Sequence, residues 1–226
     1  ITGGLRIGKH PASLGNLVYF GTGKYFENVD KDYKVSSVPQ IDSFYAILDD
    51  GTTNMTRGSL QVQTFTTTGG LRTGSTNVVD YTTKQGWYID LTVNGAKQGE
   101  RVISTPVLSG SRLIFVSIVP SGGDKCISNG TSWLNELDAL DGSMLDDKVL
   151  DTDNDGDIDA SDTKVTSVQL DGMASEPSIL DGGDGKSEKK IMGSTSASSS
   201  IITVTEKKGA TESLGGSGRM SWQQIQ

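Results

Sequence analysis

Apolar and polar residues alternate with a period near two over much of the chain, in short runs bounded by Gly, Asn, Asp or Ser. Successive side chains of a β-strand point to opposite faces, so this alternation is typical of strands that bury one face. The pattern predicts strands over residues 17–21, 44–48, 60–65, 87–93, 112–119, 133–140, 163–170 and 201–205.

Helical periodicity is missing from the sequence. No window repeats apolar residues at i, i+3, i+4 and i+7 between capping residues, so we expect helix only as a turn or two, within residues 160–163. Residues 64–79 and 183–200 are rich in Thr, Ser and Gly, and we expect loops or mobile hairpins there. The predicted fold class is therefore all-β.

An internal repeat joins a proline, a short apolar step and a glycine turn to a longer apolar run, over residues 10–21, 104–117 and 175–193. The prolines at equivalent places are Pro11, Pro106 and Pro177. A second element relates residues 45–51 to residues 136–142, because each carries a strand that ends on a turn closed by glycine. Together these elements are typical of quinoprotein-like propeller repeats, whose sheets stack radially to cover their faces.

A closed propeller has about four to eight blades of about 40 to 50 residues each. With insertions, 226 residues supply fewer blades than most such folds need. The sequence thus predicts a modified β-propeller over residues 1–226, as the C-terminal part of a larger propeller. Residues 206–226 are predicted to form a connector and closing segment, with Trp222 packed on a blade.

Charge and composition exclude several classes of protein. Lys and Arg number 20 against 28 Asp and Glu, a net charge of −8, which argues against a nucleic-acid partner. No apolar run is long enough for a membrane span, so we expect a soluble stretch. The start lacks Met and a signal-like segment, which fits a processed product or a fragment of a longer chain.

A single His and a single Cys limit the chemistry further. A zinc site of His and Cys, or a CxxC redox pair, needs several such residues. A Ser-His-Asp triad would have to use His10, which directly precedes Pro11. We expect His10 to be an ordinary surface or strand-edge residue.

The strongest local signal is an aspartate-rich stretch over residues 151–162, with Gly156 at its sixth position and Ile158 at its eighth. Its candidate ligands are Asp151, Asp153, Asp155, Asp157, Asp159 and Asp162. This is the spacing of an EF-hand-like Ca²⁺ loop, in which alternate carboxylates converge and the backbone carbonyl of the seventh residue completes the shell. The alternative is a solvated acidic loop. Gly156 at the correct offset, and Ile158 directed to the core, favour calcium.

Two features separate this loop from the usual EF-hand. Asp162 stands where Glu is usual and is one methylene shorter, so it binds calcium through water or leaves the shell to the other aspartates. The flanking segments are strand-like, so calcium here would order a loop and open no helix pair.

Several motifs occur in one order: residues 16–27, 43–49, 86–91 with 99–102, Cys126 with 130–138, the aspartate loop, and 218–222. Together they resemble the C-terminal domain of the PilY/PilC family of type IV pilus tip-associated adhesins, over nearly the whole chain. The resemblance implies the calcium loop of that family, carried here by Asp151, Asp153, Asp155, Asp157 and Asp159. The Arg-Gly-Asp integrin motif of some members is not matched, because the nearest string is Arg57-Gly58-Ser59.

The same resemblance implies a biological setting. Family members belong to large secreted proteins at the pilus tip and outer surface, and they act with minor pilins and with the N-terminal part of their own chain. They support pilus assembly by opposing retraction, and they mediate twitching motility and attachment to host or abiotic surfaces. We therefore expect a calcium-binding, non-enzymatic interaction protein.

Other interpretations stay open from the sequence. A quinoprotein-type dehydrogenase uses similar repeats, and a carbohydrate-binding propeller would differ only in its ligand. In the setting that the family implies, Cys126 pairs with a missing upstream part or remains a buried free thiol. Trp87, Trp133 and Trp222 are expected to pack between blades, with ligand stacking as the alternative.

Overall fold

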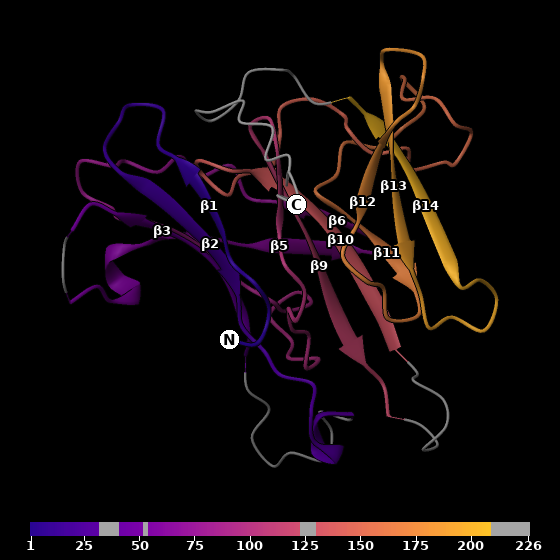
Figure 1. The fold of residues 1–226 in the computed structure, drawn as a ribbon, viewed down its shortest axis with the longest axis horizontal. Coiled ribbons are helices and arrows are strands. Elements are labelled where there is room, and N and C mark those ends of the chain that lie inside the picture. Colours follow the sequence, from indigo (N-terminus) through magenta and orange to yellow (C-terminus); the bar gives the residue numbers. More distant parts are fainter. Residues whose placement is uncertain (32–40, 52–53, 123–129, 209–226) are drawn as a thin grey trace, which may run out of the picture.

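The structure is a computed structural model that describes residues 1–31, 41–51, 54–122 and 130–208 (Figure 1). Within these ranges the chain forms three β-sheets, and its helical residues are limited to the 3₁₀ turns η1 (Asn28–Lys31) and η3 (Arg57–Ser59). The all-β prediction is confirmed. Cys126 and Trp222 lie outside the described residues.

The first sheet has the order β1-β2-β3-β7-β4. Its strands are β1 (Arg6–Lys9), β2 (Asn16–Gly21), β3 (Ser43–Asp49), β7 (Gly86–Asp90) and β4 (Gln61–Gln63). Neighbours are antiparallel except β4, which runs parallel to β7. Tyr19, Phe44 and Trp87 are fully buried on the inner face. On the other face Tyr45 stacks on both Phe20 and Tyr88.

The second sheet has the order β5-β6-β11-β10-β9-β8. Its strands are β5 (Phe65–Thr68), β6 (Leu71–Gly74), β11 (Ser167–Asp171), β10 (Gly130–Asp138), β9 (Arg112–Pro120) and β8 (Val107–Ser109). Strands β8 to β11 follow one another in the chain as an antiparallel meander. The earlier β5–β6 hairpin joins its far edge, where Ser167 pairs with Arg72.

The third sheet is an antiparallel meander of β12 (Ser178–Asp181), β13 (Ser187–Gly193) and β14 (Ile201–Lys207). Glu206 and Lys207 therefore complete β14 and do not begin the connector predicted over 206–226. Residues 209–226 of that connector lie outside the described part of the chain.

The second sheet lies between the other two, and β9 explains how (Figure 1). Leu113 and Phe115 point into a cluster shared with the first sheet. Ile114 and Val116 point the other way, into a cluster that contains Met192 and Val204 of the third sheet. Because both faces of β9 are covered, its sequence is a continuous apolar run. The two clusters are the core of the fold.

The predicted repeats over 104–117 and 175–193 coincide with the hairpins β8–β9 and β12–β13, whereas the repeat over 10–21 covers only the turn after β1 and the strand β2. Pro106 and Pro177 each directly precede the first strand of their hairpin, whereas Pro11 lies in the turn between β1 and β2. The expected equivalence of the prolines is wrong for Pro11.

Four other predictions about secondary structure are corrected or confirmed by the fold. The single strand predicted over 60–65 is divided at Thr64 between β4 and β5, which belong to different sheets. Residues 183–200, predicted as loops or mobile hairpins, contain β13, which pairs with β12 and with β14. No helix forms at 160–163. The hairpin prediction over 64–79 is confirmed by β5 and β6.

One buried ion pair joins β6 of the second sheet to the segment between β7 and β8. The guanidinium of Arg72 donates to both carboxylate oxygens of Glu100, at 2.8 and 2.6 Å, and both side chains are fully buried. The guanidinium carbon also lies 3.8 Å from the ring centre of Trp133. Trp87 is fully buried and donates its indole N–H to the carbonyl of Ala139. Both tryptophans are thus buried in the core, which favours packing over ligand stacking.

A second set of buried charges joins the second sheet to the third. It consists of Arg112, Glu136, Glu188, Lys190 and Glu206. Arg112 of β9 contacts Glu136 at 3.2 Å and Glu188 at 2.5 Å, and Lys190 pairs with Glu136 and Glu206. Burial lowers the pKa of Lys190, although the neighbouring Glu136 carboxylate opposes this shift. We refer to these residues as the inter-sheet charge cluster.

Candidate metal site and adjacent pocket

The aspartate loop lies in the connection between β10 and β11, which confirms that it interrupts a β-connection. Its first residue is fixed against β14. The N–H of Asp151 donates to the carbonyl of Thr205 at 3.2 Å, and the N–H of Lys207 donates to Val149 at 2.8 Å. Leu150 forms a β-bridge with Glu206 of the inter-sheet charge cluster. The loop therefore begins on the edge of the third sheet.

Three carboxylates of the loop come together. One oxygen each of Asp151, Asp153 and Asp155 lies within 4.8 Å of the others. Two oxygens that bind one Ca²⁺ ion at about 2.3 to 2.6 Å lie at most about 5 Å apart, so this spacing fits a shared ion. Asp151 is buried, while Asp153 and Asp155 are exposed. This acidic triad can hold a metal ion.

The backbone of the loop is bent toward the triad by left-handed residues. The carboxylate of Asp151 accepts the N–H groups of Asn154 at 2.6 Å and Gly156 at 3.0 Å. Asn154 has φ +62° and Gly156 has φ +97°, a region that most side chains avoid. Glycine at the sixth position therefore has the conformational role that the spacing predicted.

Asp157, Asp159 and Asp162 are not part of the triad. Asp162 is buried, and its two oxygens accept the N–H groups of Thr152 at 2.6 Å and Asp159 at 2.9 Å. Burial alone would raise the pKa of Asp162, but these hydrogen bonds outweigh it and the pKa is lowered. Asp162 thus ties the two halves of the loop together through the backbone. Asp159 accepts the N–H and hydroxyl of Ser161, both at 2.7 Å, which lowers its pKa.

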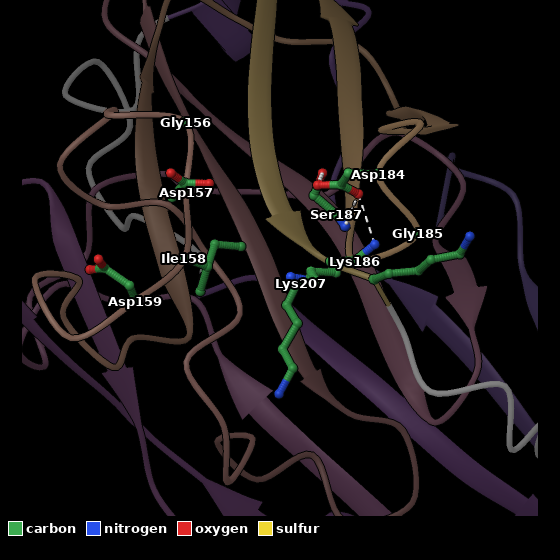
Figure 2. A pocket seen from close by; sticks show the side chains of 10 residues that line it. Gly156, Asp157, Ile158, Asp159, Asp184, Gly185, Lys186, Ser187 and Lys207 are labelled. Atoms are coloured by element: carbon green, nitrogen blue, oxygen red, sulfur yellow. Dashed lines mark hydrogen bonds between the residues drawn. The ribbon is translucent and has the colours of Figure 1, made fainter.

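The expectation that Ile158 points to the core is wrong. Ile158 is half-buried and lines a pocket between the loop and the third sheet (Figure 2). The pocket is also lined by Lys186, Lys207 and Lys208, which no motif in the sequence marks. Their signal was weak, because the lysines lie more than 20 residues from the loop and only β-pairing brings them close.

His10 is buried, with 4% of its surface exposed, which corrects the expected surface position. Its backbone N–H and carbonyl hydrogen-bond to Gly15 and Ser13, and its Nδ1 accepts the N–H of Ala12 at 3.2 Å. The ring meets Tyr81 edge-on at 4.4 Å. His10 thus fixes the turn between β1 and β2.

Acidification is expected to weaken the β1–β2 turn through His10. Burial lowers the pKa of His10 below its usual 6.5, so the unfolded chain binds a proton at a higher pH than the folded chain. The stability that neutral His10 contributes to the folded state is fully present above about pH 6.5. It is lost as the pH falls through the lowered pKa of the folded state. Asn at this position can accept the Ala12 N–H but does not titrate. In denaturant titrations, His10→Asn should lose less stability than wild type between about pH 7.5 and about pH 5; parallel pH profiles would contradict this.

The fold and the site define a class: an all-β domain of three stacked, mainly antiparallel sheets with an acidic, EF-hand-like loop inserted between two strands. No protein-family profile matches the chain. Curated relatives and a solved structure do match it.

A type IV pilus biogenesis factor PilY1 homolog of Xylella fastidiosa is 38% identical over 149 residues, which cover 63% of this chain and 10% of the relative. PilY1 of Pseudomonas aeruginosa is 32% identical over 183 residues, covering 71% of this chain and 15% of the relative. The crystal structure of the P. aeruginosa PilY1 C-terminal domain matches with a TM-score of 0.70 and 26% identity, over 93% of this chain and 45% of that one.

The chain is a homologue of the C-terminal domain of the type IV pilus biogenesis factor PilY1. This confirms the family resemblance of the sequence. The chain spans 10% and 15% of the lengths of these two curated relatives. Within the described ranges, no helix has the length and apolar character needed to cross a membrane.

Proposed function

We propose that this chain is the calcium-binding C-terminal region of a type IV pilus tip-associated protein that supports pilus assembly by opposing retraction. The observation that carries the proposal is the acidic triad, which is fixed to β14 in a homologue of the PilY1 C-terminal domain. The relatives are named biogenesis factors, and the proposed role is non-enzymatic: the chain acts through the surfaces that it holds in place.

In this proposal Asp151, Asp153 and Asp155 supply carboxylate oxygens to Ca²⁺. Asp157 supplies its backbone carbonyl by its position in the loop, and Asp159 and Asp162 complete the set directly or through water. Calcium supplies positive charge, which removes the repulsion among the aspartates. With calcium bound, the loop would stay fixed beside β14. Loss of calcium would loosen that edge of the third sheet.

We also propose that residues 1–226 are one region of a modified β-propeller. Its support is the chain order of the sheets, in which β1–β2–β3, β8–β9–β10 and β12–β13–β14 each form an antiparallel meander. Successive meanders that cover one another's faces are the building plan of propellers. In the same proposal, this region is the C-terminal part of a larger propeller.

The proposed setting is extracellular, at the pilus tip and outer surface of a bacterium. Its partners would be minor pilins of the tip complex and the N-terminal part of the parent protein, and it would contact host or abiotic surfaces in adhesion and twitching motility. The net charge of −8 leaves nucleic acid outside this set.

Calcium titration by calorimetry, with thermal unfolding in calcium and in chelator, tests the site. The wild-type chain is expected to bind about one ion and to gain about 2.7 kcal/mol when calcium exceeds its Kd about a hundredfold. Asp155→Ala should lose both effects. Asp146→Ala removes the same charge from an exposed residue outside the loop and should keep both. Equal calcium uptake by wild type and Asp155→Ala, or no uptake by either, would contradict the proposal that the acidic triad binds calcium.

The proposed role of the aspartate loop in pilus assembly is tested separately, in the full parent protein. Asp151→Asn and Asp159→Asn should reproduce the calcium-free form and change the number of surface pili in a strain able to retract them, whereas Asp146→Asn should not. Normal piliation in variants that no longer bind calcium would show that the loop does not act in pilus assembly.

A further inference from the structure

The outer face of the first sheet carries a row of large apolar side chains that crosses four of its strands. Phe20, Tyr45, Tyr88 and Val62 are paired in register on β2, β3, β7 and β4. The ring centres are 5.4 Å apart for Phe20 and Tyr45 and 5.9 Å apart for Tyr45 and Tyr88, and both pairs are stacked. Val62, with 41% of its surface exposed, continues the row to the β4 edge of the sheet.

A second, shorter row runs beside the first. Ile7 of β1, Val18 of β2 and Ile47 of β3 are paired in register. Residues two apart along a strand share a face, so Val18 and Ile47 lie on the same side of the sheet as Phe20 and Tyr45. Ile7 is 60% exposed. The two rows together cross all five strands, and we refer to them as the aromatic face.

An arginine extends this surface at its centre. The guanidinium carbon of Arg57 lies 4.0 Å from the ring centre of Tyr88 and 5.8 Å from that of Tyr45. Arg57 also forms an ion pair with Asp90 of β7. Aromatic residues and arginine are enriched in the centres of protein interfaces, and a contiguous exposed apolar patch marks an interaction site in a way that single exposed side chains do not. The aromatic face has the composition of an interface.

No strand of the described ranges forms a layer over the aromatic face. The second sheet packs on the inner face of the first sheet, and the third sheet lies beyond the second (Figure 1). The outer face of the third sheet, at the opposite end of the stack, has no comparable row, because Lys189, Thr203 and Thr205 interrupt it. An apolar sheet face is stable when another layer covers it. The aromatic face is therefore where the stack calls for a further layer.

The size of the homologous domain indicates where that layer comes from. The match to the P. aeruginosa PilY1 C-terminal domain covers 93% of this chain but 45% of that one, so more than half of that domain lies outside the match. Within this chain, a sheet with two apolar faces, such as that of β9, is covered on each face by another sheet of the same chain. A parent domain of similar length has enough residues for one more sheet on the aromatic face.

A second copy of the chain is a less favourable occupant. A segment of the same polypeptide is present at a high effective concentration, whereas a second copy binds only as its free concentration allows. Two copies would also each bring a net charge of −8 to the contact.

We propose that the aromatic face packs against a β-sheet with an apolar surface, supplied by the part of the parent protein that lies outside this chain. Tyr45, which stacks on both neighbouring rings, lies at the centre of that interface. The inference rests on the proposed function only in treating the chain as one region of a larger propeller, and it does not depend on calcium.

Cysteine labelling in the full parent protein tests the inference. Ile7→Cys and Val62→Cys place thiols at two edges of the aromatic face. Val78→Cys is the matched control, because Val78 is 74% exposed in the connection between β6 and β7. After a short pulse of a water-soluble maleimide, mass spectrometry of the peptide that carries each thiol gives its labelling rate. Both thiols of the face should react at least about tenfold more slowly than Val78→Cys in the parent protein. In the chain alone, all three should react at similar rates.

A photo-cross-linker attached to Ile7→Cys identifies the occupant. It should join to residues of the parent protein outside this chain. Rates equal to that of Val78→Cys in the parent protein would overturn the interface, whatever the chain alone does. Protection in the chain alone that disappears on dilution would assign the face to a second copy and overturn the proposed occupant, as would cross-links to a minor pilin.

Calcium uptake by the same samples separates this inference from the proposed calcium site. A freely labelled aromatic face in a parent protein that takes up calcium would overturn the interface alone. A protected face in a protein that takes up no calcium would overturn the metal site alone.

Discussion

Replacing Glu100 with alanine is expected to lower the free energy of unfolding by about 3 to 5 kcal/mol, the largest effect we expect from a single side chain. The change would leave the Arg72 guanidinium fully buried without its carboxylate. Ser117 would also lose the acceptor to which its hydroxyl donates at 2.6 Å. Burial of an unpaired charge is far more costly than the net contribution of the pair itself.

Guanidinium or urea unfolding at neutral pH measures this loss. Asp147→Ala is the matched control, because it breaks an exposed pair with Lys207 and should change stability by less than about 1 kcal/mol. The double change Arg72→Met and Glu100→Leu removes both charges and should recover much of the stability lost in Glu100→Ala. A loss below about 1 kcal/mol in Glu100→Ala would show that the pair is hydrated in solution.

Gly142→Ala is expected to destabilise the protein by about 3 kcal/mol. Gly142 has φ +68°, and a Cβ atom there would lie 2.3 Å from the indole of Trp87. Trp87 is fully buried and is held by its hydrogen bond to Ala139, so the ring has no room to move away. Left-handed backbone and overlap with the ring both contribute to the loss.

Gly51→Ala separates these two causes. Gly51 takes the equivalent place in the repeated element, has φ +84°, and has open space where its Cβ would be. It should therefore show the backbone effect alone, about 1 to 2 kcal/mol. Thermal and denaturant unfolding of both variants gives the comparison, and equal losses would mean that Trp87 does not press on Gly142.

The strands that the sequence revealed are those whose buried positions are apolar, such as β2, β3 and β9. β13 falls in a segment for which the sequence predicts loops or mobile hairpins, because Ser-Glu-Lys-Lys-Ile-Met-Gly has the polarity of a solvated stretch. Its period-two burial is nevertheless regular, since Glu188, Lys190 and Met192 are all buried. Two of these positions belong to the inter-sheet charge cluster, and a pattern of hydrophobicity cannot detect charges that are buried against partners from other strands.

The aspartate loop was found by spacing, because its signal is local in the sequence. Spacing also predicted the role of Gly156 at the bend. It could not separate the acidic triad from Asp162, whose oxygens accept backbone N–H groups of the loop. The pocket lysines were hidden for the opposite reason, since only the pairing of Leu150 with Glu206, far apart in the sequence, brings them to the loop.

The pairing of β6 with β11 also determines when the second sheet can be completed during synthesis of the chain. The β5–β6 hairpin reaches its partner strand only after roughly one hundred further residues have been made, because Arg72 pairs with Ser167. At synthesis rates of about 5 to 20 residues per second, the hairpin edge waits about 5 to 20 s. During that interval the nascent chain exposes an unpaired edge that can pair with other chains. The aspartate loop is made before β11, so it emerges from the ribosome while the edge that will close the second sheet is still open.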